Sequence, residues 1–444
     1  MKDFFVKNKS IVTFLILEIV ALTAFNFGNV SHIFGLAGGV LAILAIVFAI
    51  FISENKKSFL PLLIPVVLLL VISLSGSLNA FSKGFSKLSN LSVLLSLPGF
   101  MVLGFALRKF NDVKPRIVLI VVGIALAGIT LFGLFSTLIE YGFFYTLIYK
   151  NTPNYYYNGI PYDVTKEMYW LSGFSFGEIY IEYGSLFAIL CASFLPGLLF
   201  LSPKKDRNDF IITAGIGGVG LLSLILLPNF KALIILVVVS LFALVYRFLR
   251  NNKKAMKIIG ILFISGLGLA ILFFVISLVN AAAGYKLPGI LNRIFVENRI
   301  MQKATPIYSA LFTKHNGKLV HLFGVNTIYS SGDLVIWQDS NVFEVELLKE
   351  IGLLGTFVFG AFLVVMGYFI YHYLKQSEDE NHIKVIFVTI LLGFFVYESF
   401  FNTIVIAPHE QTYEAFLRTP TLLVILFIFG YIFTAPSKKE EQDE

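Results

Sequence analysis

The sequence contains a single cysteine, Cys191, among its 444 residues. One thiol excludes an intramolecular disulfide and leaves the redox compartment open. Charged residues are also scarce, at 14% of the chain, whereas 57% of the residues are hydrophobic and the mean hydropathy is +0.84. A soluble chain needs more polar groups than this to cover its surface. The composition therefore indicates a polytopic membrane protein.

Histidine is scarce as well, and the sequence shows no His/Cys grouping with the spacing of a metal site. We therefore expect no metal and no other cofactor. The net charge of +7 is distributed over short loops between apolar runs. We accordingly expect membrane lipid around the chain and no nucleic-acid partner.

Apolar runs near the length that crosses a bilayer, about 20 residues, recur along the chain. They predict about twelve transmembrane helices and an all-α polytopic fold. The predicted spans are 11–27, 32–53, 60–79, 91–107, 117–140, 183–201, 210–228, 232–249, 258–280, 346–373, 385–406 and 416–434. The first run follows a basic leader but carries Glu18 and has no convincing cleavage site, so we interpret it as a retained helix.

The orientation is predicted from lysine and arginine in the short loops. These residues fall on the same side as the amino terminus, which the positive-inside rule assigns to the cytoplasm. Both termini, including the charged tail 435–444, are then cytoplasmic, and 1–444 forms a single transmembrane domain. The opposite face carries two long outer segments, 141–182 and 281–345, so we expect the function there.

The first outer segment is rich in tyrosine, with Tyr155, Tyr156 and Tyr157 in succession. Two interpretations stay open, an aromatic belt at the headgroup level and a sugar-binding surface. Glu178 and Glu182 are four residues apart at the start of span 183–201, so we expect them on one helix face. They are either charges at the membrane interface or part of a polar cavity.

Three cations on the predicted outer side are candidates for binding phosphate. Lys231, at the outer end of span 232–249, either extends to the headgroups or faces an anionic lipid or phosphate. Arg293 and Arg299 lie in a predicted amphipathic helix of the second outer segment. Guanidinium groups match phosphate oxygens bidentately, so these arginines suit a pyrophosphate group, although attraction to anionic headgroups explains them equally well.

The stretch 338–355 crowds polar side chains into the start of the apolar run 351–370, where charges are expensive. Asn341 is explained by helix capping. Asp339 and Glu350 are not, and a carboxylate at the mouth of a membrane cavity suits a general base. Farther along, His409 lies in the outer link that follows span 385–406.

Several of these segments resemble one family of bacterial membrane proteins. The run Leu322–Gly324 (LFG), the pair Ser340–Asn341 and the helix start ELLKEIGLLG together resemble the signature region of the O-antigen ligase and O-antigen polymerase family. Arg299 is similar to that family's arginine before the loop, and NFKALIILVVV to a helix start in which Lys231 replaces arginine. Ser340 stands where ligases commonly carry histidine, so the chain resembles the polymerase branch more.

The resemblance implies a C-type glycosyltransferase-like architecture and an inverting, metal-independent glycosyltransferase. Its substrate would be an undecaprenyl-pyrophosphate-linked glycan on the outer face of the bacterial cytoplasmic membrane, and a chain-length regulator is a candidate partner. In the implied site, Arg299, Arg293 and Lys231 neutralise the departing pyrophosphate. Asp339 or Glu350 deprotonates the acceptor hydroxyl. Ser340, Asn341, Glu178 and His409 complete the substrate-binding set.

Other functions also fit the sequence. A ligase would transfer the glycan to another acceptor, and a flippase or transporter would move lipid-linked glycans without making a bond. Alternating-access transporters often carry internal repeats, and we find none between 1–210 and 210–444. A peptidoglycan-type glycosyltransferase has the same broad architecture, but the strict carboxylate motifs of that type are not evident in this sequence.

Overall fold

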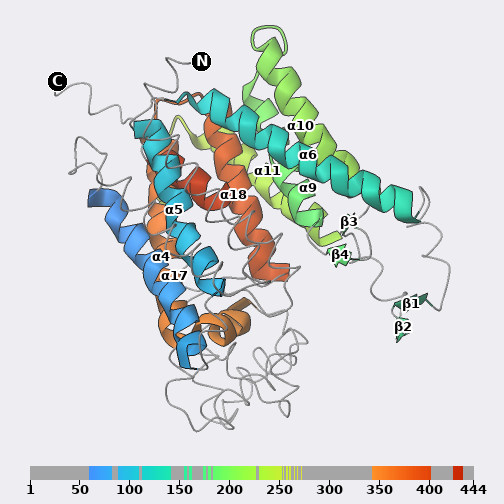
Figure 1. Cartoon of the computed structure of the whole chain (residues 1–444). Coiled ribbons are helices and arrows are strands. Elements are labelled where there is room, and N and C mark those ends of the chain that lie inside the picture. The colour runs from blue at the N-terminus through green and yellow to red at the C-terminus, as the bar shows by residue number, and fades with distance from the viewer. Residues whose placement is uncertain are drawn as a thin grey trace, which may run out of the picture. The chain divides into compact units, whose positions relative to one another are not determined.

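The computed structural model describes the following parts of the chain. They are residues 60–82, 89–109, 113–141, 155–157, 160–162, 174–176, 179–181, 184–226, 230–252, 343–401 and 424–433, with a few residues between 254 and 272. This part is predominantly helical (Figure 1). Its contacts divide into two compact units. Unit 1 comprises Met1–Asp112, Lys254–Ser377 and Glu398–Glu444, and unit 2 comprises Val113–Lys253 and Glu378–Tyr397.

Four described helices are long and apolar enough to cross a membrane. They are Pro115–Phe135, Arg207–Leu226, Ala232–Leu249 and Gly352–Lys375, each with a mean hydropathy between 2.0 and 2.8. This confirms a membrane protein with transmembrane helices. The predicted spans 11–27 and 32–53 lie outside the described residues.

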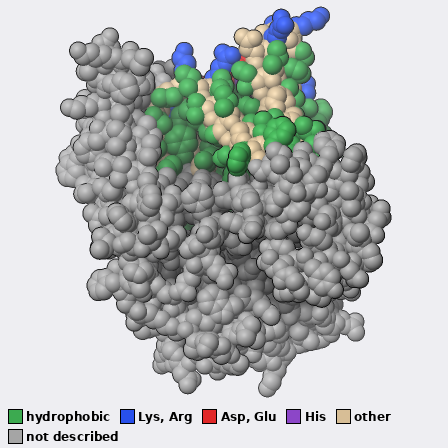
Figure 2. Space-filling view, turned by 45° about the vertical axis from the view of Figure 1, so that its right-hand side comes forward, with side chains coloured by type: hydrophobic (Ala, Val, Ile, Leu, Met, Phe, Trp, Pro, Cys, Tyr) green, Lys and Arg blue, Asp and Glu red, His purple; other side chains and the backbone are tan. Residues whose placement is uncertain are grey.

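Many large apolar side chains on these helices are exposed to the surroundings of the chain, among them Val121, Val237 and Phe248. Figure 2 shows hydrophobic side chains over much of the described surface, with lysine and arginine at its edge. Exposed apolar faces of this extent are unfavourable in water and are what lipid-facing helices require.

Unit 1 contains α4 (Leu60–Ser82), α5 (Ser89–Lys109), α17 (Phe343–Gln376) and the helix Val424–Phe433. In it, α4 packs against both α17 and α5. A Cβ atom added at Gly430 would overlap the backbone of Met101, so α5 and the helix Val424–Phe433 are in backbone contact. Small residues permit this close approach in membrane helices. Phe362 of α17 packs edge-on against Phe429, with ring centroids 5.8 Å apart.

Unit 2 contains α6 (Pro115–Tyr141), α9 (Gly184–Ala192), η3 (Leu195–Phe200), α10 (Arg207–Leu226), α11 (Phe230–Leu249) and most of α18 (Asn381–Phe401). Figure 1 shows α9 among α6, α10 and α11, and it contacts all three. From Val385 to Val388, every residue of α18 is fully buried. A helix that is apolar on all sides belongs in a protein interior, so α18 lies in the core of this unit.

Two contacts fix the packing inside unit 2. The hydroxyl of Thr389 in α18 donates to the Ser193 carbonyl oxygen at 2.7 Å, and both groups are buried. A Cβ atom added at Gly220 of α10 would overlap the backbone of Ala188 and Ala192 in α9. The two helices therefore meet at Gly220 with backbone against backbone.

The predicted continuous span 183–201 is wrong in one respect. The α-helix α9 ends at Ala192, and the chain continues as the 3-10 helix η3 from Leu195. Pro196 lies in the first turn of η3. Proline has no backbone N–H and clashes with the preceding helical turn, which accounts for the interruption.

Two short antiparallel hairpins, not expected in an all-α fold, fall in the predicted outer segment 141–182. They pair β1 (Tyr155–Tyr157) with β2 (Ile160–Tyr162), and β3 (Phe174–Phe176) with β4 (Ile179–Ile181). The residues between the strands are Asn-Gly in the first hairpin and Gly-Glu in the second. Both dipeptides favour two-residue hairpin connections.

Candidate functional site

Most of the predicted site residues lie outside the described part of the chain. These residues are Asp339, Arg299, Arg293, Asn341, Ser340, Glu178 and His409. The structure describes the backbone of the other two, Glu350 in α17 and Lys231 in α11. Glu350 belongs to unit 1 and Lys231 to unit 2.

The backbone of α17 breaks two residues after Glu350. Gly352 has φ 69° and ψ −172°, whereas the residues on either side are helical. This conformation is open essentially to glycine alone, because a Cβ atom would clash with the backbone. Figure 1 shows the orange ribbon of α17 changing direction along its length. The candidate membrane span Gly352–Lys375 lies on the carboxyl-terminal side of Glu350.

The break is stabilised locally by a side chain of the following turn. Gly352 is buried, and its carbonyl oxygen accepts a hydrogen bond from the Thr356 hydroxyl at 2.7 Å. A buried carbonyl without a partner would be costly, so Thr356 offsets part of the interruption. In membrane proteins, non-helical backbone occurs where it is covered by protein or lines a cavity. The carboxylate-bearing segment 343–351 thus enters the apolar helix through a glycine-dependent bend.

At the start of α11, Lys231 is the second helical residue, after Phe230. This agrees with its predicted place at the end of a membrane helix. The helix presents no acidic residue in its first turn.

The expected helix face shared by Glu178 and Glu182 is wrong. The residues between them, Ile179–Ile181, form strand β4, and the helix starts only at Gly184. Alternating apolar and aromatic residues on each side of Gly177 favour a strand hairpin over a helical turn. The role of Glu178 in substrate binding stays a prediction.

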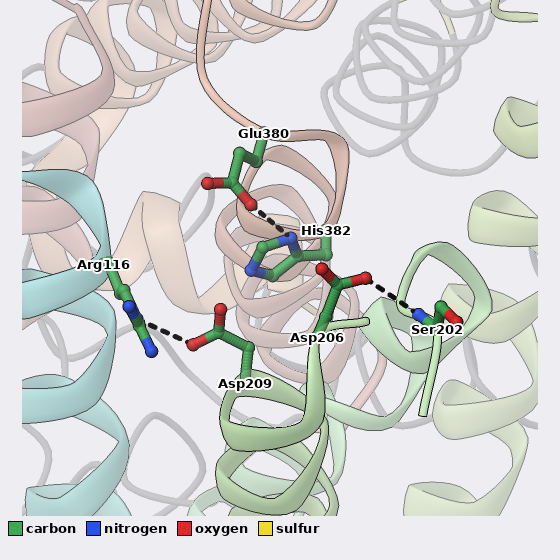
Figure 3. Close-up of polar contacts among 6 residues, drawn as sticks. All are labelled: Arg116, Ser202, Asp206, Asp209, Glu380 and His382. Carbon is green, nitrogen blue, oxygen red and sulfur yellow. Dashed lines mark hydrogen bonds and ion pairs between the residues drawn. The ribbon is translucent and has the colours of Figure 1, made fainter. Parts of the chain in front are cut away.

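A second group of polar residues lies at the helix ends of unit 2 and was not expected from the sequence. It comprises Arg116 in the first turn of α6, Asp206 and Asp209 at the start of α10, and Glu380 and His382 at the start of α18 (Figure 3). We call these five residues the helix-end cluster. Its members come from loops that the positive-inside rule assigns to the cytoplasmic side.

One ion pair and one contact between a histidine and a carboxylate hold the helix-end cluster together. Arg116 Nε lies 2.7 Å from Asp209 Oδ1, which joins the first turns of α6 and α10. His382 Nδ1 lies 3.3 Å from Glu380 Oε2. Figure 3 shows the second oxygen of Asp209 on the side of the His382 ring. Asp206 binds back into its own loop, because its carboxylate accepts the Ser202 N–H at 3.0 Å.

The His382 side chain is buried, with 5% of its surface exposed, and it lies ahead of the predicted span 385–406. Desolvation by burial lowers the pKa of His382, and this effect outweighs the nearby carboxylates, which raise it. The imidazole is therefore neutral at pH 7, with a nitrogen lone pair available. An oxygen of Asp209, an oxygen of Glu380 and a ring nitrogen of His382 all lie within 4.8 Å of one another.

No signal in the sequence predicts the helix-end cluster, because its members come from three segments that the fold alone brings together. Local spacing shows only Glu380 and His382 as neighbours, and a pair separated by one residue is too common to indicate a site. The first hairpin, in contrast, has a recognisable signal in the sequence, because Asn158-Gly159 follows three tyrosines and favours a two-residue hairpin connection.

Comparison with known proteins adds no relative. The chain matches no protein-family model, and no curated protein sequence or solved structure is significantly similar to it. The described helices and their exposed apolar faces define the class of protein, a predominantly helical membrane protein.

Proposed function

We propose that this chain is a membrane glycosyltransferase that polymerises undecaprenyl-pyrophosphate-linked oligosaccharide repeat units. The product would be a cell-surface polysaccharide of the capsule or O-antigen type. The reaction would take place on the outer face of the bacterial cytoplasmic membrane, with both chain termini in the cytoplasm.

The proposed reaction forms one glycosidic bond and breaks one sugar–phosphate bond. A hydroxyl of the acceptor repeat unit attacks the anomeric carbon of the donor glycan, with inversion at that carbon. Asp339 or Glu350 takes the hydroxyl proton. The pyrophosphate leaves with the bonding electron pair, and Arg299, Arg293 and Lys231 stabilise its charge. Ser340, Asn341, Glu178 and His409 bind sugar hydroxyls.

The observation that supports this proposal most is the bend at Gly352. It falls inside the stretch Glu350–Gly355 (EIGLLG), whose glycines carry much of the sequence resemblance. A continuous membrane helix has all its backbone groups paired and has no reason to require a glycine-only conformation. A bend that follows a carboxylate at the start of an apolar segment is expected where a polar group must reach a cavity.

The tyrosine hairpin is a second, weaker support. Its register sets Tyr155 opposite Tyr162 and Tyr157 opposite Ile160 across two antiparallel strands. Since alternate residues share one face of a strand, these four residues occupy the same face. Aromatic rings on one face suit stacking against pyranose rings, as a glycan polymerase requires.

The proposal is tested by replacing the arginine expected to contact pyrophosphate. We expect Arg299→Ala to reduce polymer yield strongly at normal membrane levels, because one charge-assisted clamp on the leaving group is lost. Arg207→Ala is the matched control, since Arg207 is an exposed arginine at the opposite, predicted cytoplasmic side. Polymer length and yield are measured on gels of cell-surface polysaccharide. Unchanged polymer in Arg299→Ala would contradict the clamp.

The bend in α17 also suits a transporter, because interrupted membrane helices commonly form substrate sites in transporters. A flippase for lipid-linked glycans is therefore the alternative function. It differs in a measurable way: a flippase moves labelled lipid-linked glycan across liposomes and leaves its length unchanged. A ligase would instead transfer the glycan to a different acceptor and would form no ladder of repeat units.

A further inference from the structure

The helix-end cluster has the composition of a metal site as well as of an ion-pair network. Asp209, Glu380 and His382 each direct one donor atom into a space in which these atoms lie within 4.8 Å of one another. They combine one imidazole with two carboxylates, a donor set that zinc and neighbouring divalent transition ions accept. The residues come from α10 and from the start of α18, so a shared ion would link these two elements.

The His382 ring is buried and held in position by a neighbouring carboxylate. Its side chain is 5% exposed, and Nδ1 is the nitrogen that contacts Glu380. Figure 3 shows the second ring nitrogen, Nε2, on the side of Asp209. A bound cation would accept its lone pair.

The charge balance of the cluster also favours a cation. Among the described charged side chains that act on the ring, those of Asp206, Asp209 and Glu380 are carboxylates and that of Arg116 is a cation. Arg116 contacts Oδ1 of Asp209, while Figure 3 shows the other oxygen on the His382 side. Asp209 can thus keep its ion pair and still offer an oxygen to a metal.

The three donor atoms would have to move only slightly closer together to bind one ion. Ligand atoms around tetrahedral zinc lie about 3.4 Å apart, given metal–ligand distances near 2 Å. The Glu380 side chain is 71% exposed and can move toward the buried His382 and Asp209 without repacking the core. Three protein ligands would leave a fourth position for water.

We propose that Asp209, Glu380 and His382 bind one divalent transition-metal ion of the zinc class. The ion fastens the start of α18 to the first turn of α10. This site is separate from the residues proposed for glycan transfer, and neither proposal depends on the other.

The test uses full-length protein without a histidine tag, purified in detergent and stripped with chelator. Zinc binding is measured by competition with a chromogenic chelator and by elemental analysis after dialysis. We expect one zinc ion per chain in the wild type. Because each substitution removes a ligand, binding should weaken at least about tenfold in Glu380→Gln and in His382→Gln. Zinc should also raise the unfolding temperature of the wild type but not of these variants.

Two controls separate this site from adventitious binding. Glu378→Gln removes an exposed carboxylate from the same loop, and His372→Gln removes a histidine from α17. Both variants should bind zinc as the wild type does. If His382→Gln fails to fold, Glu380→Gln still decides the question, because Glu380 is largely exposed. No zinc binding in the wild type, or equal binding in Glu380→Gln and Glu378→Gln, would overturn the proposal.

Discussion

The bend at Gly352 supports a direct comparison of two glycines in one helix. Gly352 has φ 69° and ψ −172° in buried surroundings. Gly360 lies farther along α17 in helical conformation, and a Cβ atom there would meet nothing within 4 Å. The same change, glycine to alanine, is therefore unfavourable for the backbone at position 352 and favourable at position 360.

The expected magnitudes follow from these conformations. Alanine at 352 would have to adopt a glycine-only region, which costs about 1–3 kcal/mol, or straighten the helix and lose the bend. Alanine at 360 replaces glycine in a helix and should stabilise it by at most about 1 kcal/mol. Gly352→Ala should therefore unfold at a lower temperature than the wild type, and Gly360→Ala at the same or a higher temperature.

Both variants can be compared by thermal unfolding in one detergent, followed through tryptophan fluorescence. A second measurement is polymer formation, since a straightened α17 would displace Glu350, the proposed general base. We expect Gly352→Ala to lose polymer and Gly360→Ala to retain it. Equal unfolding temperatures and equal polymer in the two variants would refute the argument that the bend is required.

Three further predictions concern packing and ion pairs in unit 2. Gly220→Ala should destabilise the protein by about 1–3 kcal/mol through overlap with α9, whereas Gly218→Ala, with open space around its Cβ, should be nearly neutral in thermal unfolding. Thr389→Val should cost about 1 kcal/mol, because the buried Ser193 carbonyl loses a donor; an unchanged unfolding temperature would show that bond to be unimportant. Arg116→Gln should cost less than about 1 kcal/mol, since the arginine is half exposed, and a larger loss would indicate a stronger network.

The membrane helices of unit 2 could be predicted closely from the sequence. Spans predicted at 117–140, 210–228 and 232–249 correspond to Pro115–Tyr141, Arg207–Leu226 and Phe230–Leu249. Long apolar runs identify such helices because crossing the hydrocarbon core requires a fixed number of apolar residues. The ends shift by a few residues, since helical turns extend into the headgroup region.

Interruptions were harder to predict than spans. Pro65 and Pro98 lie inside continuous helices, whereas Pro196 lies at a change from α-helix to 3-10 helix. The presence of proline therefore does not decide whether a membrane helix ends, because neighbouring helices can compensate the lost hydrogen bond. Likewise, a glycine within an apolar run does not by itself predict a bend, and the positive φ of Gly352 depends on the fold.

The helix-end cluster could not be predicted at all. Arg116, Asp209 and His382 lie in the first turns of three helices, next to loops that resemble ordinary positive-inside segments. Only the packing of α6, α10 and α18 brings an ion pair and a buried imidazole to the same place. Long-range polar groups of this kind leave no periodic pattern in a sequence.

The measurement that tests the central claim most directly is a reconstituted polymerisation reaction. Purified protein is incubated in detergent with a synthetic undecaprenyl-pyrophosphate-linked repeat unit and without added metal, and the products are separated on a gel and weighed by mass spectrometry. We predict a ladder of two, three and more repeat units that disappears in Arg299→Ala and persists in Arg207→Ala. A repeat unit that stays single, while protein-containing liposomes carry it across their bilayer, would contradict the polymerase and identify a transporter.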